Sequence, residues 1–183
     1  MDHIEVIRLL LRVTARTSFV LFFAAFIARA SQLLWPGKYT DWLAQNCGRF
    51  LIALGISHTV HLFVIVSLVV SLGEKFRLPA GLHGLLAGIF VYFMIYILAL
   101  RSFLRAPEGR FWQIVDSPLF ERCAMYSIWT IFAISFLSRV RLGPPVYSFL
   151  GVAIIAGPII RITAGIRTQL LRGKEQKSVG WIQ

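Results

Sequence analysis

Two histidines, His58 and His61, lie near the middle of a long apolar run and are the residues best suited to chemistry in this chain. They are three positions apart, so they share one face of a helix. A histidine at membrane depth is costly, usually faces the interior of a helix bundle, and is therefore a candidate for a functional site. Gly55 lies three residues before His58 on the same face and opens room beside the pair.

An imidazole inside a membrane can have one of three roles, and the sequence does not decide between them. It can be the axial ligand of a b-type haem or another tetrapyrrole. It can form a structural hydrogen bond to a neighbouring helix, or it can contact lipid, quinone or pigment. If a metal is bound, His61 is the expected ligand and His58 the structural member of the pair. A bis-histidine haem is disfavoured, because His83 lies about 16 Å from the depth of His61 at 1.5 Å per residue.

The element that must position the pair is a helix over residues 49–71, which is long and apolar enough to cross a bilayer. The whole chain has 183 residues, of which 57% are hydrophobic and 15% charged. A soluble domain is nearer half apolar and a quarter charged. The composition therefore predicts an all-α integral membrane protein with no separate soluble domain.

The positions of the basic residues argue against a nucleic-acid-binding protein, and the positions of the cysteines argue against a disulfide framework or a zinc site. The net charge of +11 would suit a nucleic-acid partner. The basic residues, however, fall mostly at the ends of apolar runs, where they anchor helices, so no nucleic acid is expected. The cysteines Cys47 and Cys123 form no CxxC pair, so neither a disulfide framework nor a zinc site is expected.

The hydropathy pattern predicts a bundle of about five transmembrane helices within residues 18–166. The expected spans are residues 18–35, 49–71, 80–100, 123–137 and 146–166. Residues 1–17 have arginine at every fourth position opposite an apolar side, which predicts an amphipathic helix that lies in the interface or leads into the first span. Residues 167–183 are expected to form a basic tail.

Small residues at the start of the third span predict a helix packing face. Gly81, Gly84 and Gly88 lie there, and residues 84–88 form a GxxxG motif. That spacing lets two helices approach closely in lipid. We therefore expect Gly84 and Gly88 to lie at a contact between helices. In the fifth span, Gly157 and Pro158 are expected to produce a kink.

No catalytic constellation is present in the sequence. It contains no HExxH motif, Walker loop or GxGxxG, and its acidic residues all fall in loops or at helix ends. A proton relay or a cation transporter would normally place a carboxylate inside a span. Ion pumping is therefore disfavoured, and any enzymatic role would be that of a membrane electron-transfer subunit.

One stretch resembles a known family. Arg49, Gly55 and His61 are each separated by five residues. This spacing resembles the signature that opens a helix in the ferric reductase-like transmembrane family, which includes the haem-binding membrane subunit of the bacterial methionine-sulfoxide repair system. Residues 99–102, 111–112 and 126–129 resemble later family segments, so the resemblance covers about residues 45–140. It implies that His61 matches the first haem ligand.

The chain departs from the family after this helix, because no histidine follows His83. A two-haem electron pathway is therefore not expected. The resemblance leaves two interpretations open: a redox protein that passes electrons through a single haem b at His61, or a cofactor-poor accessory subunit of a larger respiratory or photosynthetic membrane complex. Either protein would contact the lipid bilayer and other membrane subunits, and we expect the bacterial inner membrane as its location.

Overall fold

The computed structural model describes residues 2–73, 81–104, 109–140 and 145–179, with side chains as far as Leu171. Within these ranges the chain is helical and contains no strand. The seven helices are α1 (His3–Leu34), α2 (Lys38–Gln45), α3 (Cys47–Leu72), α4 (Gly81–Leu104), α5 (Arg110–Val115), α6 (Pro118–Val140) and α7 (Val146–Val179). The predicted all-α fold is confirmed.

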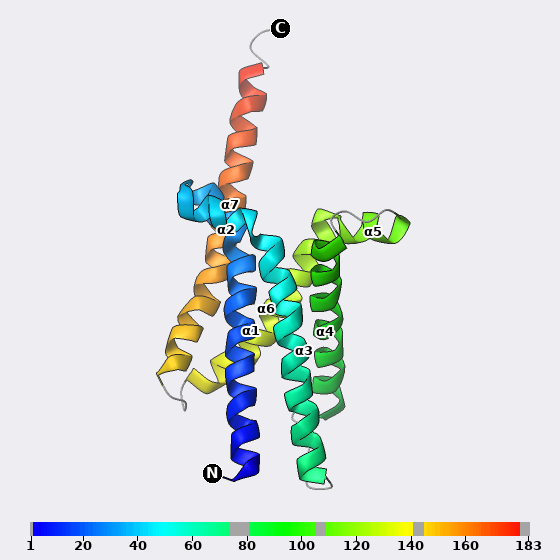
Figure 1. Ribbon diagram of the computed structural model, residues 1–183. Coiled ribbons are helices and arrows are strands. Elements are labelled where there is room, and N and C mark those ends of the chain that lie inside the picture. The colour runs from blue at the N-terminus through cyan, green and yellow to red at the C-terminus, as the bar shows by residue number, and fades with distance from the viewer. Residues whose placement is uncertain (1, 74–80, 105–108, 141–144, 180–183) are drawn as a thin grey trace.

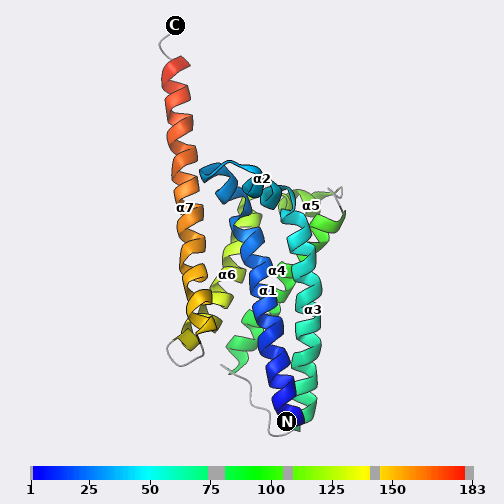
Figure 2. The same ribbon diagram turned by 60° about the vertical axis from the view of Figure 1, so that its left-hand side comes forward.

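Five of the helices, α1, α3, α4, α6 and α7, are long and apolar enough to cross a membrane. They correspond one to one to the five predicted spans. Helix α1 packs against α3 and α7, and α6 packs against α4 and α7. The short helices α2 and α5 lie across the same end of the bundle, beyond which α7 projects (Figures 1 and 2).

The helices at the two ends of the chain are longer than the apolar runs that predicted them. Helix α1 already begins at His3, so residues 3–17 continue the first span in one unbroken helix. Helix α7 continues to Val179 and so includes most of the basic segment that follows Ile166. Arginine, lysine, leucine and glutamine are good helix formers, so the backbone helix does not end where hydropathy falls.

Aromatic side chains of α1 and α6 fill the centre of the bundle. Phe19 and Phe22 of α1 both pack against Phe132 of α6, with ring centroids 5.4 Å apart in each pair. Phe136 lies one turn further along α6 and is 5.4 Å from Phe19. Offset and edge-to-face pairs of this kind add to the stabilisation from burial alone.

The contact between α6 and α7 includes one unusual hydrogen bond. The indole Nε1 of Trp129 donates to the carbonyl oxygen of Ile154 at 3.0 Å. Helix α7 contains Pro158 and continues through it. Beside that proline, a Cβ added to Gly157 would lie 3.2–3.3 Å from ring atoms of Phe23 and Phe26. This glycine therefore allows α7 to approach α1 closely.

Two glycines of the expected packing face, Gly81 and Gly88, have no neighbouring helix beside them in the described part of the chain. A Cβ added to Gly88 or to Gly81 would meet no atom of the described residues within 4 Å. Gly84 is half-buried. The close approach of α3 and α4 lies instead at Gly55, where an added Cβ would be only 2.9 Å from the Cβ of Ala99. A GxxxG motif marks a surface that another helix can approach, but within the described chain no helix passes over Gly88.

Candidate functional site

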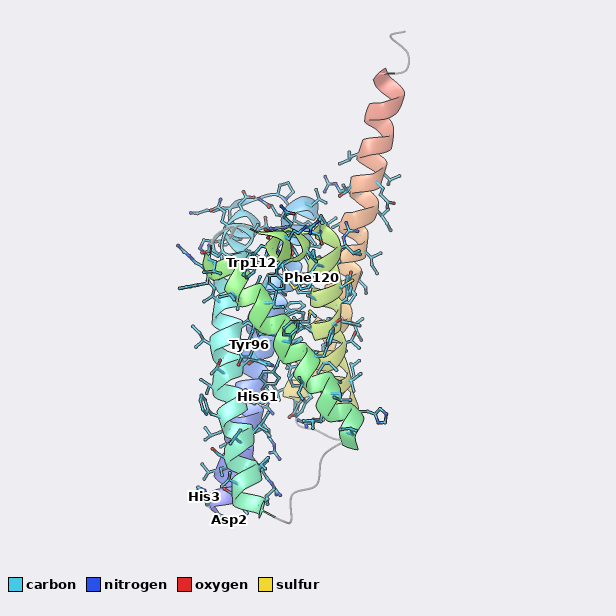
Figure 3. The ribbon with its side chains drawn as sticks, turned by 90° about the vertical axis from the view of Figure 1, so that its right-hand side faces the viewer. Asp2, His3, His61, Tyr96, Trp112 and Phe120 are labelled. Carbon is cyan, nitrogen blue, oxygen red and sulfur yellow. The ribbon has the colours of Figure 1, made fainter. Side chains whose placement is uncertain are left out.

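The two histidines lie about halfway along α3, where this helix faces α1 and α4. Figure 3 shows His61 beside the point where α4 crosses the bundle at an angle. The His58 side chain is buried and that of His61 is half-buried. Their ring centroids are 5.6 Å apart. Neither ring points away from the protein, as the cost of burying a polar group in hydrocarbon requires.

His61 is held by a hydroxyl group of α1. Its Nδ1 lies 2.7 Å from Thr14 Oγ1. The Thr14 hydroxyl also lies 2.8 Å from the carbonyl oxygen of Leu10, to which it donates its single proton. The hydroxyl therefore accepts from His61, and we assign the proton of the neutral imidazole to Nδ1. This tautomer leaves the lone pair of Nε2 available to a ligand.

His58 has a different environment, in which aromatic rings surround the imidazole. The ring of Tyr92 lies 4.8 Å and that of Phe132 6.0 Å from the imidazole, measured between centroids. Two buried polar atoms here, His58 Nδ1 and Tyr92 Oη, have no hydrogen-bond partner among the described residues. Most buried polar atoms in proteins are hydrogen-bonded, so this pair of rings is a place where a polar ligand group would be stabilised.

Further hydroxyl pairs join the same three helices. Ser18 of α1 and Ser57 of α3 have their Oγ atoms 2.9 Å apart. Thr59 Oγ1 and Tyr96 Oη lie 3.1 Å apart across α3 and α4. Tyr96 therefore bonds to a threonine and not to a histidine. The sequence predicted a hydrogen bond from a histidine to a neighbouring helix, and it gave no indication that Thr14 would be the partner.

The packing of α3 against α4 is confined to the half of the bundle that contains the first half of α3 and the second half of α4. Every buried residue of α3 precedes His61, and every buried residue of α4 follows Phe90. The second half of α3 and the first half of α4 instead expose large apolar side chains, such as Phe63 at 68% and Phe90 at 48% exposure. Gly88 lies one turn before Tyr92 on the same face of α4. His61 thus lies at the boundary between a closed and an open half of the bundle.

The geometry allows one axial ligand but not a bis-histidine site. His58 and His61 come from the same helix, and a centroid separation of 5.6 Å leaves no room for a macrocycle between them. Among the described residues, no three histidine, cysteine, aspartate or glutamate side chains form a group that could hold a metal ion. A single imidazole on one side of a haem iron needs no such group.

No family model, curated protein or solved structure matches the chain. The side chains around His61 are therefore the basis for assigning a function.

Proposed function

We propose that this protein is a membrane-embedded redox subunit of the ferric reductase-like type, in which His61 binds a single haem b through Nε2. The observation that carries this proposal is the hydrogen bond between His61 Nδ1 and Thr14 Oγ1, 2.7 Å long. Histidines that bind metals almost always donate their other ring N–H to a carboxylate, a backbone carbonyl or a water, which fixes the tautomer and the ring orientation. The Thr14 hydroxyl would take the place of such an acceptor here.

The residues around His61 fit such a group. His58 Nδ1 and Tyr92 Oη are buried without partners and would hydrogen-bond to polar substituents of the bound macrocycle. Gly88, where an added Cβ would meet no atom of the described residues, would let a flat group lie against the backbone of α4. When bound, a haem supplies one-electron transfer. The apolar helices around it would exclude water and limit access by solvent, which affects the redox potential.

The test is an absorption spectrum of the detergent-purified protein, expressed with ample haem precursor. We expect a Soret band that shifts on reduction and that is lost in His61→Ala. The matched control is His83→Ala, because His83 is exposed at the start of α4 and precedes Tyr92 by nine residues. A colourless wild-type protein, or an unchanged band in His61→Ala, would refute the proposal.

One observation favours the second candidate, an accessory subunit of a larger membrane complex. In the open half of the bundle, α3 and α4 no longer pack against each other and expose Phe63 and Phe90. A neighbouring subunit would replace the lipid chains that otherwise cover this surface. Purification in mild detergent distinguishes the two functions: co-purification with larger subunits and no cofactor favours the accessory role, and a stable, isolated, redox-active protein excludes it. Because the chain resembles the ferric reductase-like family, we propose the bacterial inner membrane as its location under either function.

A further inference from the structure

A cavity of about 550 Å³ lies where α1, α6 and α7 meet, near the end of the bundle that carries α2 and α5. It is distinct from the surroundings of His61. Its charged lining consists of Arg29, Arg122 and Arg161 and a single acid, Glu121. Its apolar lining includes Phe26, Ala164 and Gly165. The volume is that of a small-molecule site, and the lining combines cationic and apolar side chains.

The one acid in the cavity is already paired with cations. Glu121 Oε2 accepts from Arg101 Nη1 at 3.1 Å, and its Oε1 lies 3.5 Å from Arg29 Nη1. Arg101 in turn lies 2.6 Å from Asp116. Among the described residues, no carboxylate forms a salt bridge with Arg122 or Arg161. The cavity therefore has an excess of positive charge that its own carboxylate does not neutralise.

Arg161 is the most constrained of these cations. Its guanidinium carbon lies 4.6 Å from the ring centroid of Phe26 and 5.4 Å from that of Tyr126, and its Nη1 donates to the carbonyl oxygen of Phe26 at 3.0 Å. These contacts hold the planar fork in one orientation at the cavity wall. A charged side chain inside an apolar span is costly and marks a functional site by default.

The depth of the cavity suits the headgroup region of a bilayer. Arg167 of α7 hydrogen-bonds to the carbonyl oxygens of Leu33 and Leu34, which end α1. Arg161 precedes Arg167 by six residues, so it lies about 9 Å inside the end of the bundle. Basic pockets between transmembrane helices on the cytoplasmic or matrix side of a membrane bind anionic lipid headgroups.

We propose that the cavity between α1, α6 and α7 is a phosphate-binding site, with Arg161 and Arg122 as its principal ligands. Arginine presents a planar set of donors that matches phosphate geometry and stays charged at every physiological pH. The phosphate can belong to an anionic lipid headgroup, whose chains would follow the apolar wall, or to free inorganic phosphate. This assignment does not depend on haem binding at His61.

The experiment measures binding of two probes to the detergent-purified full chain. One probe is short-chain phosphatidylglycerol, and the other is inorganic phosphate, compared with chloride at equal ionic strength. Binding is followed by the thermal unfolding midpoint and, for the lipid, by native mass spectrometry. We expect at least one probe to bind, and Arg122→Gln and Arg161→Lys each to weaken it by about tenfold, because a charge-assisted hydrogen bond is lost.

The control variant is Arg110→Gln, which removes an exposed arginine of α5 that does not line the cavity and should leave binding unchanged. The two test variants are chosen to spare the fold. Arg161→Lys keeps the charge while removing the planar fork, and Arg122→Gln alters an exposed side chain that should not affect folding. Binding of only the lipid or only inorganic phosphate supports the site and identifies the source of the phosphate. Binding of neither probe, or equal binding by wild type and both cavity variants, overturns the proposal.

Discussion

Trp129 of α6 supplies the hydrogen bond that Pro158 denies to Ile154 within α7. In an unbroken helix the carbonyl oxygen of residue 154 accepts from the N–H of residue 158, which a proline lacks. The indole Nε1 of Trp129 donates to that oxygen instead, at 3.0 Å, and Ile154 is fully buried. A side chain on one helix thus satisfies the backbone defect of its neighbour, which explains how α7 continues through a proline.

This relationship predicts coupling between the two positions. Trp129→Phe leaves the carbonyl oxygen of Ile154 without a donor and should cost about 1–3 kcal/mol in free energy of unfolding. In a chain that also carries Pro158→Ala, the N–H of the alanine can donate to the carbonyl oxygen of Ile154. The destabilisation caused by Trp129→Phe should then be about 1 kcal/mol smaller. Thermal unfolding in detergent measures both, with Trp112→Phe on the short helix α5 as the control. Strict additivity of the two substitutions would contradict this account.

A second prediction concerns the close approach of α3 and α4. Gly55→Ala places a Cβ 2.9 Å from that of Ala99, and neither atom can rotate away. We expect a loss of about 1–3 kcal/mol in the free energy of unfolding, the usual cost of overpacking. Ala99→Gly in the same chain should restore most of it. Gly88→Ala is the matched control, because a Cβ there meets no atom of the described residues within 4 Å. It should not destabilise the protein and should add about 0.5–1 kcal/mol of helix stability.

The hydrogen bond from His61 to Thr14 allows a third test. Thr14→Val keeps the shape of the side chain but removes the acceptor of His61 Nδ1, so the free energy of unfolding should fall by about 1 kcal/mol. If His61 binds haem, the Soret band should also shift or weaken, because the ring loses its orienting partner. Thr17→Val is the control: Thr17 bonds only to its own helix, at Val13. Equal effects of the two substitutions would show that Thr14 does not position His61.

The fourth prediction addresses the end of α1. Arg167 Nη1 donates to the carbonyl oxygens of Leu33 and Leu34 at 2.8 and 3.0 Å, which satisfies acceptors that the helix itself leaves free. Its positive charge also lies at the negative end of the α1 dipole. Arg167→Gln should therefore lower the unfolding midpoint by an amount equivalent to about 1 kcal/mol. Arg110→Gln should have no effect, and an equal loss in both variants would argue against a capping role.

The sequence was sufficient for the helical class, the five spans and the position of the histidine pair, because hydropathy and the cost of polar groups in lipid both act along the chain. It did not reveal what the histidines contact. Thr14 faces His61 because of the relative rotation of α1 and α3, and periodicity within one helix carries no information about that rotation. For the same reason the GxxxG motif at residues 84–88 did not indicate which helix, if any, would pass over it.

The grouping of the residues that line the cavity could not be predicted from the sequence, for a different reason. Arg29 and Arg161 were each visible as charges interrupting an apolar run, and Glu121 as an acid near the start of a span. Nothing in their spacing predicts that they meet, because they lie on three helices separated by up to 132 positions in the chain. A charge within a span is itself the signal, and three of them on separate helices give reason to look for a shared ligand.

Helix α7 also has mechanical consequences. It is one continuous helix from Val146 to Val179, joined to α6 at Ile154 and to α1 at Arg161 and Arg167. The portion beyond Arg167 is about 18 Å long at 1.5 Å per residue. Because the helix is fixed only at these contacts, a rotation of the rigid helix by about 10° about them would displace its far end by about 3 Å. Small repacking inside the membrane would thus be converted into a measurable movement outside the bundle.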